Sequence, residues 1–263
     1  MAQPFHDIQV TYNGIGKTTV AWILDSRFDD PFPHMFELQF SQSSAGFDAG
    51  EYVTIAQGSK ATQLVDTVFR DSGISSLAFY RVQLTTPAGV YKSDFKGLAG
   101  NVAGSNLGIL KELLRKENIL FRKDRGAISG YLFKRRYYGP SCSCTDKNSK
   151  TLVSNACAKC AGTGFFDGYF PGIEFPILIE SPEVRHAQIE PTGISDVRQL
   201  LVRCLVSPVA DSKDIWMEAD TNKTYEVKEY TVTSRLSYLP VAAKIELREL
   251  PLVDTISLLL TLL

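Results

Sequence analysis

Histidine is scarce in this 263-residue chain, which contains only three. His6, His34 and His186 lie far apart in the sequence, and none of them falls in a recognisable metal-binding or nucleophile motif. No other group of residues resembles a catalytic set, so we expect a protein that is not an enzyme.

The net charge is also small, because 28 Lys and Arg residues oppose 29 Asp and Glu residues and leave −1. This balance excludes a whole-chain electrostatic attraction to nucleic acid or to an anionic membrane.

Long hydrophobic runs and targeting signals are also missing. The longest apolar stretch, ISLLLTLL at residues 256–263, is far too short to span a bilayer. The first ten residues, MAQPFHDIQV, lack the basic start and apolar core of a secretory signal. Five cysteines without an export signal indicate a reducing compartment, where clustered thiols bind metal more often than they form disulfides. We therefore expect an intracellular product with no membrane partner.

The first hundred residues are patterned as β-strands. Residues 79–84 and 90–93 flank a turn, and earlier segments alternate apolar and polar residues between turn signals, which is typical of a β-sandwich. The alternating apolar residues are Ile8, Val10, Tyr12, Val20, Trp22, Leu24, Phe36, Leu38 and Phe40. Residues 13–18 are similar to a phosphate-binding loop, but Thr11 stands where that motif needs its first glycine. Because a strand pattern follows instead of a helix, we exclude nucleotide binding there.

The placing of aromatic residues in these strands is informative. Trp22 lies on the second predicted strand. Tyr80-x-Val82 lies on the penultimate strand, and Tyr91-x-Ser93 lies on the last one. Over residues 4–98 this order resembles a fibronectin type III or similar immunoglobulin-like module. The resemblance implies that a domain spanning residues 1–98 is a β-sandwich. We expect Trp22 and Tyr80 to pack in its core, because large aromatic side chains dominate such cores.

A helix and a basic segment follow, and we assign them with a linker to residues 99–136. Ser105 or Asn106 can cap the helix, whose apolar residues have helical spacing. These are Leu107, Leu110, Leu113, Leu114, Leu120 and Phe121. Between residues 111 and 136 nine basic residues oppose three acids, so this segment carries +6. Such a segment can bind nucleic acid phosphates, bind an acidic neighbouring subunit or form a solvated helix face, and nucleic acid is the least favoured of the three.

Four cysteines are the sharpest chemical signal. Cys142-x-Cys144 and Cys157-x-x-Cys160 are two short-spaced thiol pairs separated by twelve residues, a pattern that suits a tetrahedral metal ion. Small residues beside the thiols leave room for backbone amides to donate hydrogen bonds to the sulfur atoms. We predict that all four cysteines bind Zn²⁺ in a closed, structural site. An iron–sulfur cluster, redox-active disulfides and metal-free thiols are the alternatives. The Cys-x-Cys spacing is tighter than the usual Cys-x-x-Cys, which disfavours the iron–sulfur cluster and makes Cys142 the weakest of the four ligand assignments. The fifth cysteine, Cys204, lies in an apolar strand pattern and is expected to be a buried packing residue.

The residues around the thiols carry a second resemblance. The context consists of Tyr138-Gly139-Pro140 before the cysteines and of Gly162–Phe170 and Pro176-Ile177 after them. It resembles a cysteine-rich element of tailed-bacteriophage virion proteins. Later segments resemble the closing strands of head–tail connection and neck proteins; they are Asp214–Trp216, Tyr225–Val227 and residues 241–254. The resemblance implies a mainly β chain, with a zinc element at residues 137–172 and a β-rich assembly domain at residues 173–263.

The same resemblance implies a non-enzymatic structural protein of a phage virion, made in the cytoplasm of the host bacterium. We expect a homo-oligomeric ring in the neck or head–tail connection, as a connector, adaptor or collar. Its expected partners are neighbouring virion proteins of the portal, connector or tail. A tail or baseplate component, a zinc-ribbon nucleic-acid-binding protein and a carbohydrate-binding sandwich are the alternatives.

The apolar C-terminus favours a role in assembly. Residues 255–263 have the composition of an exposed strand, which is an aggregation hazard on an isolated subunit. We expect this strand to pair with a neighbouring subunit in preference to folding back on its own sheet.

Overall fold

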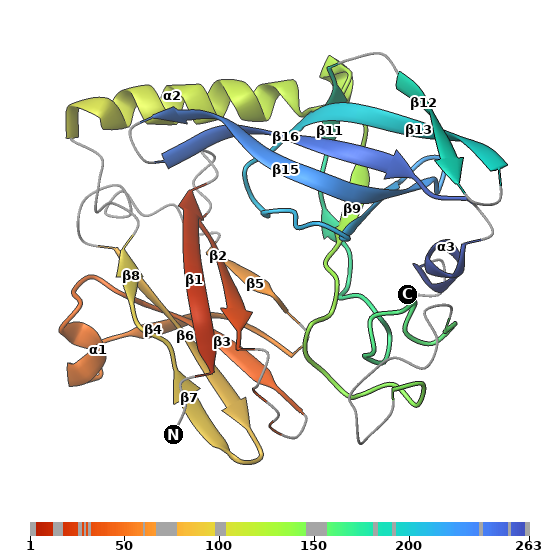
Figure 1. The fold of residues 1–263 in the computed structure, drawn as a ribbon. Helices are drawn as coiled ribbons and strands as arrows, with labels where there is room; N and C mark the ends of the chain where they lie inside the picture. The colour runs from red at the N-terminus through yellow and green to blue at the C-terminus, as the bar shows by residue number, and fades with distance from the viewer. Residues whose placement is uncertain are drawn as a thin grey trace. The chain divides into compact units, whose positions relative to one another are not determined.

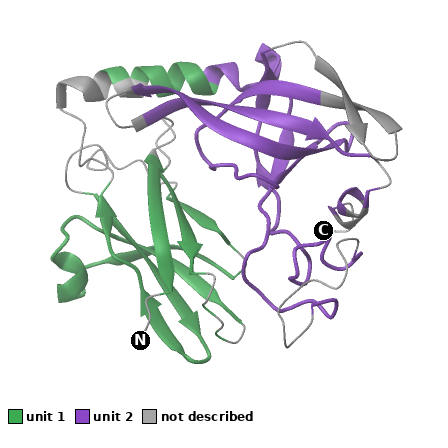
Figure 2. Ribbon diagram, in the orientation of Figure 1, with its two compact units in different colours: residues 1–118, 236–239 green, residues 119–235, 240–263 purple. Residues whose placement is uncertain are grey.

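A computed structural model describes most of the chain. The described residues are 4–12, 18–25, 28, 30, 33–59, 61–66, 78–97, 104–145, 157–180, 184–190, 193–236, 239–251 and 254–260. The fold is mainly β, as the sequence predicts, with several antiparallel sheets and few helices (Figure 1). The chain divides into two compact units, residues 1–118 with 236–239 and residues 119–235 with 240–263 (Figure 2).

The first unit is a β-sandwich. Its elements are β1 (Phe5–Tyr12), β2 (Thr18–Leu24), β3 (Met35–Ser41), α1 (Gly46–Ala49), β4 (Val53–Gly58), β5 (Gln63–Asp66), β6 (Phe79–Thr86), β7 (Gly89–Lys92) and β8 (Lys96–Gly97). One sheet has the order β1-β2-β5, and the other has the order β4-β3-β6-β7 with β8 beside β6. This distribution of strands between two antiparallel sheets agrees with the predicted fibronectin-like sandwich.

The core of the sandwich consists of the side chains that alternate in the sequence. Trp22 from one sheet packs against Phe36 from the other, with ring centroids 4.8 Å apart. Both are buried, and Tyr80 is buried on β6, so the prediction that Trp22 and Tyr80 pack in the core is confirmed. The residues 13–17 that resemble a phosphate-binding loop lie outside the described part of the chain, but a strand begins at Thr18, as expected.

A long helix, α2 (Gly104–Leu120), follows the sandwich in the sequence and confirms the predicted helix. The predicted cap is wrong, because the helix begins at Gly104, and Ser105 and Asn106 lie inside it. A short 3₁₀ turn, η2 (Lys123–Arg125), comes directly after it. Leu114 is buried on α2, as helical spacing of its apolar residues requires.

The second unit is built around one antiparallel sheet. Its strands are β9 (Gly130–Phe133), β10 (Ile173–Glu174), β11 (Ile177–Ile179), β12 (Val184–Glu190), β13 (Gly193–Cys204), β14 (Ile215–Glu218), β15 (Thr224–Leu236) and β16 (Leu239–Glu249). Their order is β10-β9-β14-β15-β16-β13-β11, with β12 beside β13. Ile128, just before β9, exchanges two backbone hydrogen bonds of 2.9 and 3.0 Å with Ile177 of β11. These bonds join β11, at one end of the sheet, to the segment that leads into β9, near the other end. The sheet is thereby closed into a small barrel.

The barrel is filled by apolar side chains around Trp216. The indole Nε1 of Trp216 donates a 2.9 Å hydrogen bond to the carbonyl of Phe175, which satisfies the only polar atom of this buried side chain. Gly130 faces the indole ring so closely that a Cβ atom there would lie 2.4 Å from it. Cys204 is also buried in this core, where burial raises the pKa of its thiol, in agreement with the predicted packing role.

The C-terminal prediction is wrong for the described residues 254–260. Instead of a strand available to a neighbouring subunit, the structure has a short helix, α3 (Thr255–Leu260). Leu260 is buried in a cluster with residues of its own unit, and Ser257 is buried as well. The apolar composition of this run favours a strand, but here packing against the same chain stabilises a helix. Residues 261–263 lie outside the described part.

Candidate metal centre

Two antiparallel arms of irregular backbone carry the four clustered cysteines. One arm leaves β9 and the other leads to β10, and backbone hydrogen bonds of 2.8–3.0 Å join them at four levels. These bonds run from Phe170 to Lys134, from Arg136 to Gly168, from Phe166 to Pro140 and from Cys142 to Gly164, each named from N–H donor to carbonyl acceptor. The far ends of the two arms, which hold the thiols, are therefore brought together by the backbone.

Tight turns present the thiols in pairs. The Thr145 N–H donates to the carbonyl of Cys142 in the first arm, and the Ala161 N–H donates to the carbonyl of Cys157 in the second. Ala161 has a φ of +46° and the following Gly162 has a φ of +74°, a left-handed conformation that glycine adopts without strain. The sequence Ala-Gly after Cys160 thus allows the chain to turn sharply beside the sulfur atoms.

The structure brings the four predicted ligands together. The Sγ atoms of Cys142, Cys144, Cys157 and Cys160 all lie within 4.8 Å of one another. The Sγ atoms of Cys142 and Cys157 are 3.7 Å apart, and those of Cys144 and Cys160 are 3.3 Å apart. A disulfide would need about 2.05 Å, whereas four sulfurs at about 2.3 Å from a tetrahedral zinc ion are separated by about 3.8 Å. These residues therefore form a cluster that can hold a metal ion.

Backbone N–H groups point at the sulfur atoms, as the small neighbouring residues predict. The N–H of Lys159 donates to the Cys157 thiol and is the main reason why the pKa of that thiol falls to about 7. The N–H groups of Gly162 and Gly164 donate to Cys160, although burial raises the pKa of that thiol. N–H···S hydrogen bonds stabilise the thiolate, which is the form that binds a metal ion. The backbone around Cys157 and Cys160 therefore favours thiolates over neutral thiols.

A buried ion pair fixes the base of the two arms to the barrel. The carboxylate of Asp214, the residue directly before β14, lies 2.7 Å from Lys134 Nζ. It also accepts hydrogen bonds from the N–H groups of Arg135 at 2.8 Å and Asp211 at 2.7 Å. Asp214 is 1% exposed, and a buried carboxylate is tolerated only where such partners surround it.

A buried arginine joins the two arms to each other. The Arg136 side chain donates a 2.9 Å hydrogen bond through Nε to the carbonyl of Tyr169 and lies over the ring of Phe170 at 4.9 Å. Its other end is 3.6 Å from the Asp167 carboxylate. The sequence does not predict Arg136 and Asp214 as parts of the centre. The only signal for Arg136 is its place beside Tyr137-Tyr138 at the end of the basic segment.

Most of the basic segment is engaged within the chain. Among the side chains that the structure describes, seven cations of this segment have a partner in the same chain at up to 3.9 Å, either a carboxylate or, for Arg135, the carbonyl of Gly162. The seven are Arg115, Lys116, Lys123, Arg125, Lys134, Arg135 and Arg136. Lys134 and Arg136 are structural parts of the metal-centre arms, and Arg115 and Lys116 on α2 are exposed.

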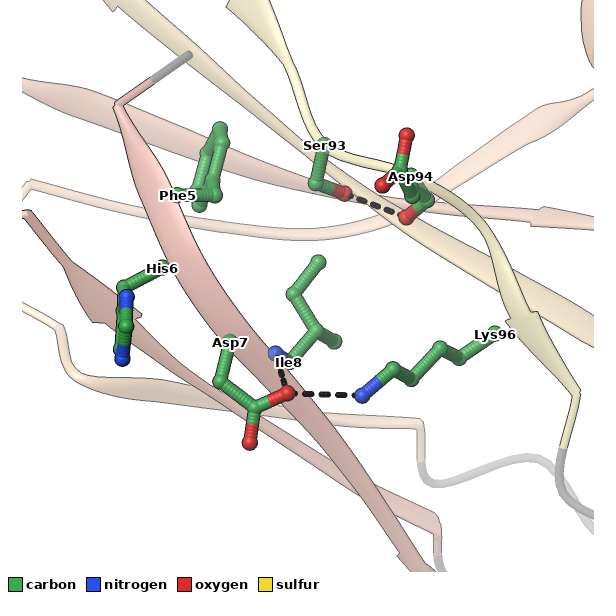
Figure 3. Close-up of a pocket in the computed structure, with 7 residues that line it drawn as sticks. All are labelled: Phe5, His6, Asp7, Ile8, Ser93, Asp94 and Lys96. Atoms are coloured by element: carbon green, nitrogen blue, oxygen red, sulfur yellow. Dashed lines mark hydrogen bonds and ion pairs between the residues drawn. The ribbon is translucent and has the colours of Figure 1, made fainter.

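A shallow cavity of about 260 Å³ in the sandwich is a weaker candidate site (Figure 3). It is lined by Phe5, His6, Asp7, Ile8, Ser93, Asp94 and Lys96. The Asp7 carboxylate is paired with Lys96 Nζ at 2.7 Å, and the Ser93 hydroxyl donates to the carbonyl of Asp94 at 2.8 Å. These polar groups satisfy one another instead of converging on the cavity, so the cavity indicates no particular ligand.

Comparison with known proteins adds little to this picture. No family model matches the chain, and no curated protein matches it. A solved structure of titin kinase and its flanking domains matches 94% of this chain and 37% of that chain, with 8% identity and a TM-score of 0.28. A TM-score this low supports no conclusion about fold or function, and the chain spans little more than a third of the titin fragment. In the part of the chain that the structure describes, no helix is long and apolar enough to cross a membrane.

Proposed function

We propose that the protein is a non-enzymatic structural protein that binds one zinc ion through Cys142, Cys144, Cys157 and Cys160. The observation that carries this proposal is the gathering of four Sγ atoms within 4.8 Å of one another. Four thiolates fill a tetrahedral coordination sphere and leave no position for a reactive water molecule, so the ion stabilises the fold and does not catalyse a reaction. When bound, zinc supplies a cross-link between the two arms.

Zinc is preferred to other occupants because of the donor set. Four soft, anionic sulfur ligands suit zinc, and they also suit iron. Backbone N–H donors to Cys157 and Cys160 favour any thiolate-bound metal over free thiols. The Sγ–Sγ distances of 3.7 Å for Cys142–Cys157 and 3.3 Å for Cys144–Cys160 agree with a single ion among the four sulfur atoms.

The assembly that this element serves is, in our proposal, a ring in the neck or head–tail connection of a tailed-phage virion. The support is the resemblance of the cysteine–glycine–aromatic run, residues 138–177, to virion proteins. The rigid frame around the centre is consistent with a scaffold: a closed barrel, a buried Lys134–Asp214 pair and a buried Arg136 hold the arms in place. A tail or baseplate position is the nearest alternative.

A nucleic-acid-binding role is not supported to the same degree. Lys123, Lys134 and Arg136 pair with carboxylates outside the basic segment, which reduces the charge left for phosphate contacts. We expect no binding of duplex DNA or RNA above that of serum albumin at low salt. Tight binding that weakens steeply with salt would favour this alternative.

Two measurements on the purified full chain test the proposal. Elemental analysis is expected to find one zinc per chain, and light scattering after size-exclusion chromatography is expected to find a discrete oligomer. Cys160→Ser should lose the zinc, whereas Cys204→Ser, which alters a cysteine in the barrel core, should retain it. A chain free of metal would contradict the zinc site, and a monomer at all concentrations would contradict the ring.

A further inference from the structure

The C-terminal helix α3 depends on the surface that it packs against. It has only six residues, and isolated helices shorter than about 12–15 residues are marginal in water. Asp254 Oδ1 accepts a 2.9 Å hydrogen bond from the N–H of Ile256, which caps the first turn. Buried Ser257 forms a 2.5 Å hydrogen bond with the Thr224 hydroxyl and donates to the carbonyl of Pro251. Without these contacts the helix has little reason to form.

The surface on which α3 packs is formed by residues of the barrel and of the second metal-centre arm. Leu260 is 3% exposed and lies in a cluster with Phe133 and Ile215 of the barrel and with Tyr169 of the second metal-centre arm. Partly buried Ala161, which comes directly after Cys160, packs against the same cluster. The helix therefore covers the join between the barrel and the arm that carries two of the four thiols.

The two arm residues in this surface, Ala161 and Tyr169, are held by hydrogen bonds of the metal-centre arms. The N–H of Ala161 donates a 2.7 Å hydrogen bond to the carbonyl of Cys157, within the turn that presents the second thiol pair. The carbonyl of Tyr169 is held by Arg136 Nε at 2.9 Å. When a bound ion fixes the turn Cys157–Cys160, it also fixes Ala161 against the cluster. When the turn is loose, α3 loses part of its support.

We infer that metal binding at the four cysteines and docking of α3 are thermodynamically coupled, so that α3 acts as a latch on the metal centre. This inference rests on the proposed function of the centre as a metal site. Coupling is reciprocal: if the metal stabilises docked α3, then docked α3 raises the affinity for the metal by the same factor. Couplings of this kind are typically about 5- to 150-fold.

Hydrogen exchange tests the first direction. The full chain is analysed as purified and after metal removal with a strong chelator, and exchange of the peptide that covers residues 254–260 is followed by mass spectrometry. We expect exchange in this peptide to become about tenfold faster without metal, while peptides from β15 and β16 keep their protection.

Variants of α3 test the reverse direction. Leu260→Ala and the milder Ser257→Ala each remove a contact of the docked helix. Competition with a chromogenic zinc indicator is expected to show about tenfold weaker zinc binding for Leu260→Ala, and a smaller loss for Ser257→Ala. Leu201→Ala, which alters a leucine that is 41% exposed on β13, is the matched control and should leave zinc affinity unchanged.

The outcomes separate this inference from the proposed function. A chain that binds no zinc contradicts both. A chain that binds zinc, but whose α3 exchange and zinc affinity respond neither to chelation nor to Leu260→Ala, contradicts only the coupling. Weaker zinc binding in Leu260→Ala together with faster exchange of metal-free α3 supports it.

Discussion

The backbone N–H of Cys142 donates a 2.8 Å hydrogen bond to the carbonyl of Gly164. This contact joins the turn of the first thiol pair to the turn of the second pair without involving a side chain. The backbone thus brings the two turns side by side, and a bound metal ion is expected to hold them in place.

Removal of one thiol is expected to unfold the arms locally. Cys157→Ser or Cys160→Ser forfeits most of the metal-linked folding energy, which is about 10–16 kcal/mol for structural zinc in small peptides at pH 7. Hydrogen exchange should show loss of protection in residues 137–170. Protection in the barrel strands should persist, because their core lies around Trp216 and does not include the thiols. Unchanged protection of the arms in metal-free Cys160→Ser would show that the metal is not what orders them.

Loss of the buried carboxylate under the arms is expected to destabilise the second unit strongly. Asp214→Asn leaves Lys134 without its 2.7 Å buried partner, a kind of change that typically costs about 3–5 kcal/mol. Asp211→Asn is the matched control, because Asp211 is the second carboxylate that pairs with Lys134, its side chain is 66% exposed, and exposed pairs contribute at most about 1 kcal/mol. Chemical denaturation compares the two. Equal effects of the two variants would contradict the role given to Asp214.

Replacement of the glycine beside Trp216 is expected to distort the barrel. A Cβ at residue 130 would lie 2.4 Å from the indole ring, so Gly130→Ala should lower the free energy of unfolding by about 1–3 kcal/mol or more. Gly89→Ala is a suitable control, since nothing lies within 4 Å of a Cβ at that position. Thermal unfolding that is as little affected by Gly130→Ala as by the control would contradict this packing.

The arginine that joins the arms is expected to support metal binding indirectly. Arg136→Lys keeps the charge, but it loses the fork that reaches the Tyr169 carbonyl and Asp167 together. We expect zinc affinity to fall about 10- to 100-fold, as for other groups that orient metal ligands. Arg125→Lys, at an arginine whose side chain is 64% exposed, should bind zinc normally. Indistinguishable affinities of the two variants would assign Arg136 a role in packing alone.

Local patterns predict much of the fold. Alternation at Val20, Trp22 and Leu24 is a property of neighbouring residues, so the sandwich strands can be recognised from the sequence. Barrel closure by Ile128 and Ile177 cannot be predicted from the sequence, because local patterns do not show which distant segments pair. The C-terminus illustrates a missed signal. Asp254 as a cap and buried side chains three residues apart at Ser257 and Leu260 follow a helical period, but the apolar composition favours a strand.

The sequence predicts the ligands of the candidate site but not the residues that support them. Ligand spacing brings Cys142, Cys144, Cys157 and Cys160 to attention, because two thiol pairs from two turns can surround one ion. The supporting groups Arg136 and Asp214 cannot be found in this manner. Their importance comes from burial and from partners far along the chain, which only the tertiary structure supplies.

X-ray absorption spectroscopy at the zinc edge of the purified full chain reports the ligands of the metal centre. We expect one zinc per chain with a shell of four sulfur atoms at about 2.3 Å. A shell that contains nitrogen or oxygen donors, or a chain that holds no zinc when it is purified with zinc present, would contradict this expectation.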